Sequence, residues 1–193
     1  EYNGTGKTFI IQTWESDAWL VASSVGNNAT YNMDSVRNYR DWITARQNAV
    51  NAARAANPGS DVKLYNCMEI STVATKGKLL TDVIPATRCD LYAYSVWENL
   101  VYGYSLDANL KLFKSYVPAS GTVGSKNYYV GEYGMPEMNY GRERTYGFNV
   151  QSTKIMLNNG YRYINFWQIY CNEQTSGEKG SHNNEDMRGF WLI

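Results

Sequence analysis

The sequence predicts an α/β fold with a parallel sheet, and three observations support this prediction. Strand-like apolar runs alternate with helical segments along the 193 residues, and this alternation implies parallel pairing through right-handed crossovers. The runs are apolar at successive positions, which is typical of strands covered on both faces. The length is sufficient for one domain with a sizeable core.

The first strand is expected at 7–14, where β-branched and aromatic residues follow a glycine-rich lead-in. That lead-in lacks the first glycine of a phosphate-binding loop, so nucleotide binding is not expected. The clearest helix is 33–56, because Val36 and Tyr39 begin a helical repeat and the breakers at 57–59 end it.

The remaining elements continue the alternation. Apolar runs predict four further strands, at 61–70, 89–97, 127–134 and 161–170. Helical spacing and stop signals predict helices between them, at 76–84, 105–117 and 143–160, of which the first has the weakest pattern. No Gly-x-Gly-x-x-Gly motif opens any of these helices, so a dinucleotide-binding sheet is not expected.

Composition excludes several classes of protein. The 18 Lys and Arg residues balance 18 Asp and Glu residues, which leaves no electrostatic footprint for nucleic acid or an anionic membrane. No apolar stretch is long enough to span a bilayer, and the N-terminus has no signal-peptide layout. The 17 Tyr and 6 Trp residues suit either pockets for ring-shaped polar ligands such as sugars or an aromatic-rich core.

Cysteine and histidine usage argues against metal chemistry. Cys67, Cys89 and Cys171 are widely spaced and odd in number, so buried free thiols are expected in place of a disulfide framework. There is no CxxC pair, and His182 is the only histidine. A zinc site or a histidine-based triad is therefore not expected, and neither is a cofactor.

Polar and aromatic residues follow the C-terminal ends of the expected strands, which is where the catalytic groups of a (β/α) barrel lie. Two carboxylates stand out, because Glu15 and Glu132 each follow an apolar run directly and have aromatic neighbours. Paired carboxylates can cleave a glycosidic bond, one as acid and the other as nucleophile or base. The alternative is that each glutamate faces solvent or forms a loop salt bridge.

Several segments resemble a known superfamily. GEYG at 131–134 resembles the strand-seven nucleophile motif of the clan A glycoside hydrolases, which are (β/α)8 TIM barrels, and INFWQIYCNE at 164–173 is similar to their strand eight. RGFWLI at 188–193 looks like the segment that follows it. More narrowly, IIQTWESDAW, YSVWE and GEYGMPE are similar to a little-described bacterial group in which a Trp-Glu-x-Asp motif ends strand four.

The resemblance implies a retaining glycoside hydrolase that cleaves a β-linked oligo- or polysaccharide. Glu132 would be the nucleophile and Glu15 the general acid/base. Trp167 would form the platform under the sugar, and Tyr94 would orient Glu132. Further substrate-binding candidates are Trp14, Trp19, Trp97, Tyr133 and Asn172.

Some assignments stay open. Glu69 is the alternative acid and Glu98 a weaker one, while Glu173 either binds a sugar hydroxyl or forms a loop salt bridge. One position departs from the superfamily, because Trp14 stands where many members have an Asn that binds the sugar 2-hydroxyl. That departure favours a second hypothesis, a non-catalytic carbohydrate-binding protein on the same scaffold. A third is a metal-dependent barrel enzyme using carboxylates such as Glu15, Asp17 and Glu69.

The resemblance also makes the first strand of this chain strand four of the barrel. Residues 1–193 would then form a single catalytic domain that holds strands four to eight. Five strands cannot close such a barrel, and both outer strands would expose unpaired edges. We therefore expect a missing segment, a second chain or a partner copy in a homodimer to complete it. A secreted or periplasmic location is expected, in which case the export signal has already been removed from this chain.

Overall fold

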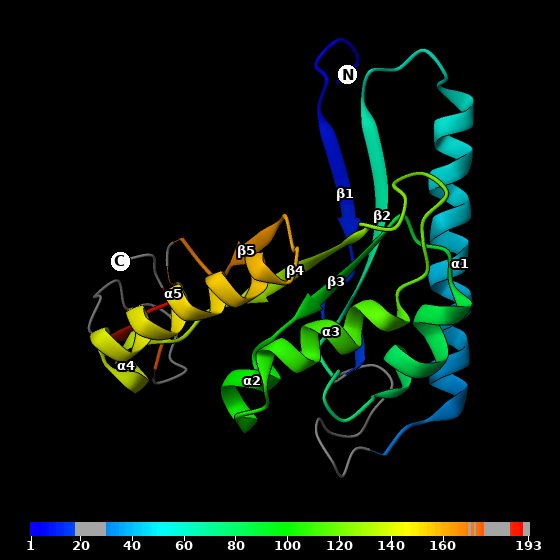
Figure 1. Cartoon of the computed structure of the whole chain (residues 1–193). Helices are drawn as coiled ribbons and strands as arrows, with labels where there is room; N and C mark the ends of the chain where they lie inside the picture. Colours follow the sequence, from blue (N-terminus) through cyan, green and yellow to red (C-terminus); the bar gives the residue numbers. More distant parts are fainter. Residues whose placement is uncertain (18–29, 170, 172, 176–185, 191–193) are drawn as a thin grey trace.

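The fold is a five-stranded, all-parallel sheet whose strands pair in sequence order (Figure 1). The computed structural model describes residues 1–17, 30–169, 171, 173–175 and 186–190. The strands are β1 (Thr8–Gln12), β2 (Lys63–Ile70), β3 (Leu91–Ser95), β4 (Tyr128–Tyr133) and β5 (Ile164–Phe166). The expected α/β class with parallel pairing is confirmed.

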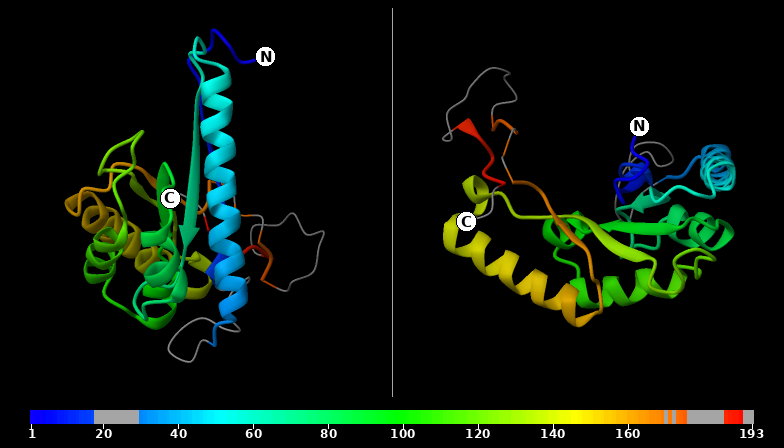
Figure 2. Two further views of the ribbon diagram at one scale, coloured as in Figure 1. Left: turned by 90° about the vertical axis from the view of Figure 1, so that its right-hand side faces the viewer. Right: turned by 90° about the horizontal axis from the view of Figure 1, so that it is seen from above.

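The sheet is curled and open, like part of a barrel wall (Figure 2). Its order leaves β1 and β5 as edges that do not pair with each other. The edge strand β1 exposes Ile10 and Ile11, each at 46%. On the uncovered face, Ile10, Leu91 and Tyr129 border a hollow of about 620 Å³.

Helices cover the other face of the sheet (Figures 1 and 2). They are α1 (Met33–Ala56), α2 (Trp97–Tyr102), α3 (Leu106–Tyr116), α4 (Glu137–Tyr140) and α5 (Arg142–Asn158). The expectations for the helices that became α1, α3 and α5 are confirmed. None of the described helices is long and apolar enough to cross a membrane.

Three boundaries differ from the sequence-based expectation. The helix expected at 76–84 is a π-helical turn, Leu79–Val83, followed by a 3-10 turn, Ile84–Ala86. Pro85, which lacks a backbone N–H, lies in the first turn of the 3-10 segment, where a helix tolerates proline. The strand expected at 89–97 ends at Ser95, and Trp97 begins α2 instead. The last strand, expected at 161–170, has only three residues.

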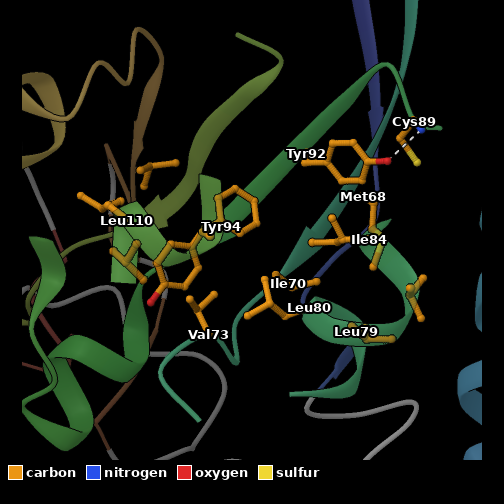
Figure 3. Packing of buried hydrophobic residues seen from close by; sticks show 14 of the residues in the cluster. Met68, Ile70, Val73, Leu79, Leu80, Ile84, Cys89, Tyr92, Tyr94 and Leu110 are labelled. Carbon is orange, nitrogen blue, oxygen red and sulfur yellow. Dashed lines mark hydrogen bonds between the residues drawn. The ribbon is translucent and has the colours of Figure 1, made fainter. Parts of the chain in front are cut away.

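The core lies between the sheet and the helices (Figure 3). Met68 and Ile70 of β2, and Tyr92 and Tyr94 of β3, point to this side with Leu110 of α3, and all are fully buried. The alternate strand residues Cys67, Ala93 and Tyr129 form a separate small cluster. Successive side chains of a strand point to opposite faces, so the second cluster lies on the face that bears no helices.

A buried polar cluster fastens α1 to the amino ends of the strands. Asp90, directly before β3, accepts hydrogen bonds from Arg54 Nη1 and Gln47 Nε2, both at 3.0 Å, and from the Asn66 amide at 3.1 Å. Burial acts to raise the pKa of Asp90, but these donors hold it below its usual value. Breaking this network would leave a buried charge unpaired, which is strongly destabilising.

The cysteines are all free, as expected. Cys67 and Cys89 are buried, and burial raises the pKa of both thiols. Cys171 is half-buried. These thiols therefore act as small apolar groups in the packing.

Candidate functional site

A cleft of about 460 Å³ lies at the carboxyl ends of the strands. It brings together six of the residues singled out from the sequence, namely Trp14, Glu15, Trp97, Glu132, Trp167 and Glu173. The other residues that line it are Leu100, Pro136, Asn139, Tyr140, Arg188 and Phe190. Parallel strands bring their carboxyl ends to one edge of the sheet, which is why residues so distant in sequence meet here.

The centre of the site is formed by Ser95, Glu15 and Glu132. Ser95 and Glu132 are register partners on β3 and β4, just beyond an irregularity in the pairing. The Ser95 hydroxyl lies within hydrogen-bonding distance of Glu15 Oε1, in a short contact, and 3.3 Å from Glu132 Oε2. Trp97, which begins α2, donates its indole N–H to the same Glu132 oxygen at 2.8 Å.

The hydrogens available to this cluster determine which carboxyl group is protonated. A serine hydroxyl has one hydrogen, so it can donate to Glu15 or to Glu132 but not to both. Both contacts are attractive only if one carboxyl group keeps its own proton and donates to Ser95 Oγ. Glu132 already accepts the Trp97 hydrogen, which favours its charged form. Glu15 is therefore the group that holds the proton.

The environments of the two carboxyl groups agree with this assignment. Burial, together with the charges of Glu132 and Asp17, raises the pKa of Glu15 to about 7 although Ser95 acts to lower it. Burial also raises the pKa of Glu132, which is 9% exposed, while Trp97 and Ser95 oppose that shift. A neutral acid beside a charged carboxylate is the arrangement that separates acid from nucleophile.

Glu69, the alternative acid, lies beneath this pair without reaching the cleft. Its side chain is fully buried, and none of the described residues makes a hydrogen bond of good geometry to either carboxyl oxygen. Burial and the neighbouring charges of Glu132 and Glu15 raise the pKa of Glu69 to about 9. Gln12 acts to lower this pKa, but burial outweighs it. A buried carboxyl group is far less costly when neutral, so Glu69 keeps its proton at neutral pH.

Trp167 and its partners form the opposite wall. Its indole N–H donates to Glu173 Oε1 at 2.6 Å, and Arg188 Nη1 lies 2.9 Å from Glu173 Oε2. Glu173 therefore forms an ion pair and also fixes the Trp167 ring. The backbone of β4 approaches this wall closely, because a Cβ atom at Gly134 would overlap the carbonyl oxygen of Trp167.

Two of the expected site residues point to the helices. Tyr94 is fully buried in the core, and its hydroxyl donates to Glu98 Oε1 at 2.6 Å. The Tyr133 hydroxyl pairs with Thr153 Oγ1 of α5 at 2.8 Å. Neither tyrosine lines the cleft, and Ser95 and Trp97 contact Glu132 in the place expected for Tyr94. Trp19 and Asn172 lie outside the described residues.

The other acidic candidates are used to hold loops. Asp17 accepts hydrogen bonds from the amide and hydroxyl of Ser71 and from the Thr72 amide. Glu98 accepts from the amides of Val73 and Ala74 at 2.9 and 2.8 Å. Across the part of the chain that the structure describes, no three His, Cys, Asp or Glu side chains gather to hold a metal ion.

Sequence reasoning overlooked Ser95, Tyr140, Arg188 and Phe190. One signal pointed to Ser95, because the small residues Ala93 and Ser95 alternate with the large Tyr92 and Tyr94. A period of two separates the faces of a strand and would have assigned Ser95 to the face of the cleft. Arg188 and Phe190 lie in a loop, where no period applies.

Comparison with known proteins identifies no relative. No protein-family model, curated protein or solved structure matches this chain. The function is therefore argued from the geometry of the cleft.

Proposed function

We propose that the protein is a glycoside hydrolase that cleaves a β-linked oligo- or polysaccharide with retention of anomeric configuration. The observation that carries this proposal is the Ser95 hydroxyl, which contacts one oxygen of each carboxyl group. Two atoms bonded to one hydroxyl lie within about two hydrogen-bond lengths, or roughly 6 Å, of each other. Retaining enzymes hold the two carboxyl groups about 5–5.5 Å apart, and inverting enzymes roughly 6.5–9.5 Å.

Glu132 is the nucleophile in this mechanism and Glu15 the acid/base. A Glu132 oxygen attacks the anomeric carbon while the bond to the leaving oxygen breaks, and Glu15 gives its proton to that oxygen. Water then attacks the same carbon, Glu15 takes a proton from this water, and the bond to Glu132 breaks. Both groups return to their starting states, and one water has been consumed.

The walls of the cleft suit a sugar. Trp14 is 60% exposed beside Glu15, and Trp97 and Trp167 add indole rings near Glu132. Indole and phenol rings offer a flat apolar face and a polar edge, which matches the two kinds of surface on a pyranose ring.

The sheet is most simply read as part of a (β/α)8 barrel. The curl of the five parallel strands and the exposed apolar residues of β1 support this reading. The remaining strands would come from a longer form of this polypeptide, from a second chain or from a partner copy. The intact mass and the solution mass of the natural protein distinguish these sources.

Turnover of a panel of aryl β-glycosides tests the proposal. Glu132→Gln keeps the shape of the side chain but removes the nucleophile, so turnover is expected to fall at least about 1,000-fold while binding of the sugar persists. Glu143→Gln, on the exposed part of α5, is the matched control and should resemble the wild type. Equal rates for the wild type and Glu132→Gln on a hydrolysed substrate would refute the assignment.

A second candidate is a carbohydrate-binding protein without catalysis, favoured by Trp14 at the position where the resembled superfamily has an Asn. Its exposed ring offers a stacking surface instead of an amide for the sugar 2-hydroxyl. Binding of β-linked oligosaccharides by calorimetry, with no turnover of any aryl glycoside, is the result expected of this alternative.

A further inference from the structure

The Ser95 hydroxyl contacts the carboxyl groups of both Glu15 and Glu132. Ser95 is fully buried near the end of β3, so its oxygen is fixed and only the hydroxyl hydrogen can turn. Glu132 has a second donor in Trp97, whereas Ser95 is the only described hydrogen-bond partner of the Glu15 carboxyl group. The Ser95 hydroxyl can thus rotate so that its hydrogen points to whichever carboxyl group is negatively charged.

We infer that Ser95 is a positioning residue whose single hydrogen turns toward whichever of Glu15 and Glu132 is charged during turnover. This inference rests on the proposed function. Ser95 contacts no reacting atom of the substrate in this scheme and acts only through the two carboxyl groups.

The direction of the hydrogen follows from the charges in each state. In the free protein Glu132 is charged and Glu15 neutral, so Ser95 donates to Glu132 and accepts from Glu15. In the glycosyl-enzyme, Glu132 is an ester without charge, and Glu15 has lost its proton to the leaving group. Ser95 then donates to the Glu15 carboxylate, which stabilises the base required for the second step.

The second step can be isolated with an activated substrate. A 2,4-dinitrophenyl leaving group needs little help from an acid, so kcat on such a β-glycoside reports hydrolysis of the glycosyl-enzyme. Ser95→Ala removes the hydrogen, and Ser95→Cys keeps the shape with a weak donor. Both are expected to lower kcat by about 10- to 100-fold, the effect of one hydrogen bond to a charged group. Ser95→Thr retains the hydroxyl and should recover most of this loss.

The resting state is tested without turnover. Carboxyl titration by ¹³C NMR should give a higher midpoint for Glu132 in Ser95→Ala than in the wild type, because one donor to the charged form is gone. The charged or titratable neighbours of this pair are Asp17, Glu69 and Glu173, and Ser95→Ala changes none of them. Ser152→Ala, a buried serine on α5, is the control for packing and should leave the Glu132 midpoint in place.

The outcomes separate this inference from the proposed function. If Glu132→Gln abolishes turnover but Ser95→Ala keeps the wild-type kcat and the wild-type Glu132 midpoint, the role of Ser95 is refuted and the glycosidase assignment stands. If no aryl glycoside is hydrolysed, the proposed function fails, and an unchanged Glu132 midpoint in Ser95→Ala would also refute the hydrogen sharing. A raised midpoint together with a slower second step supports the inference.

Discussion

Gly131 of β4 lies so close to the carboxyl group of Glu69 on β2 that any side chain at position 131 would have to displace it. A Cβ atom at Gly131 would overlap Glu69 Oε1 and would lie 3.2 Å from the Cβ atom of Ala93. The glycine before Glu132 is therefore explained by a carboxyl group two strands away in the sheet. Glu69, Gly131 and Glu132 form one packed unit.

Gly131→Ala is expected to lower the free energy of unfolding by about 1–3 kcal/mol, the usual cost of overpacking a core. The added methyl group must displace either the Glu69 side chain or β4. Adding Glu69→Ala should recover part of the loss, because it removes the atoms that clash. Urea denaturation of both single variants and the double variant measures this coupling.

Gly147→Ala provides the matched control. Gly147 lies inside α5 and a Cβ atom there meets no atom within 4 Å, so alanine should raise stability by about 0.5–1 kcal/mol. Additive effects of Gly131→Ala and Glu69→Ala would contradict the packing described above.

Glu69→Gln should make the protein less sensitive to alkaline pH. The folded state holds the Glu69 proton up to pH about 9, whereas the unfolded chain releases it near the usual 4.5. Between these values unfolding releases a proton, so stability falls as pH rises, by at most about 1.4 kcal/mol per pH unit. Glutamine does not titrate, and the variant should gain stability relative to the wild type with rising pH. Denaturation curves that stay parallel across the pH range would argue against a protonated Glu69.

The rate of hydrolysis should follow a bell-shaped pH profile. On the alkaline side kcat/KM should fall with a midpoint at about 7, because Glu15 loses the proton it must donate. On the acid side it should fall at a pH above the usual value for a glutamate, since the pKa of Glu132 is raised. With Glu15→Gln and a dinitrophenyl substrate, the alkaline fall should disappear. Its persistence would show that another group is the acid.

Trp97→Phe removes the indole donor to Glu132 while keeping an aromatic ring. The acid side of the pH profile should move to higher pH, and kcat/KM should fall about 10- to 100-fold, because the charged carboxylate loses a hydrogen bond. Trp42→Phe, at a 47% exposed tryptophan of α1, is the control and should behave like the wild type. If the acid side of the profile does not move in Trp97→Phe, the Trp97 hydrogen bond does not stabilise the charged form of Glu132.

Asp17→Asn is expected to destabilise the loop that follows β2. Asp17 accepts hydrogen bonds from Ser71 and Thr72, and an amide at this position would face those N–H donors with its own. The loss should be about 1.5–3 kcal/mol, measured by thermal or urea denaturation. Asp41→Asn, in an exposed ion pair with Arg40, should change stability by less than about 1 kcal/mol. Equal small effects of both variants would contradict a structural role for Asp17.

The sequence was a good guide to the helices with a clear apolar stripe and to the order of the strands. It predicted the boundaries between consecutive strands and helices less well. Val96 and Trp97 prolong the apolar run of β3, but the chain turns into α2 there. When a strand is apolar on both faces, the sequence pattern does not show where the strand ends.

The site was predictable in its carboxylates but not in their partners. Glu15 and Glu132 stand out because charged residues rarely end buried strands. The alternation of small and large residues along β3 marks Ser95 for the face of the cleft, but the irregular register that sets Ser95 opposite Glu132 leaves no trace in the sequence. The aromatic residue was the more conspicuous candidate, whereas the small hydroxyl makes the contact.

The Asp90 cluster lies at the opposite end of the strands from the cleft. The side chains that fasten α1 to the sheet are thus separate from Glu15, Ser95 and Glu132, and no described contact joins the two groups. Mutations in the loops around the cleft need not loosen that fastening. This separation lets the sequence around the cleft vary during evolution, while the cluster at the other end keeps the protein folded.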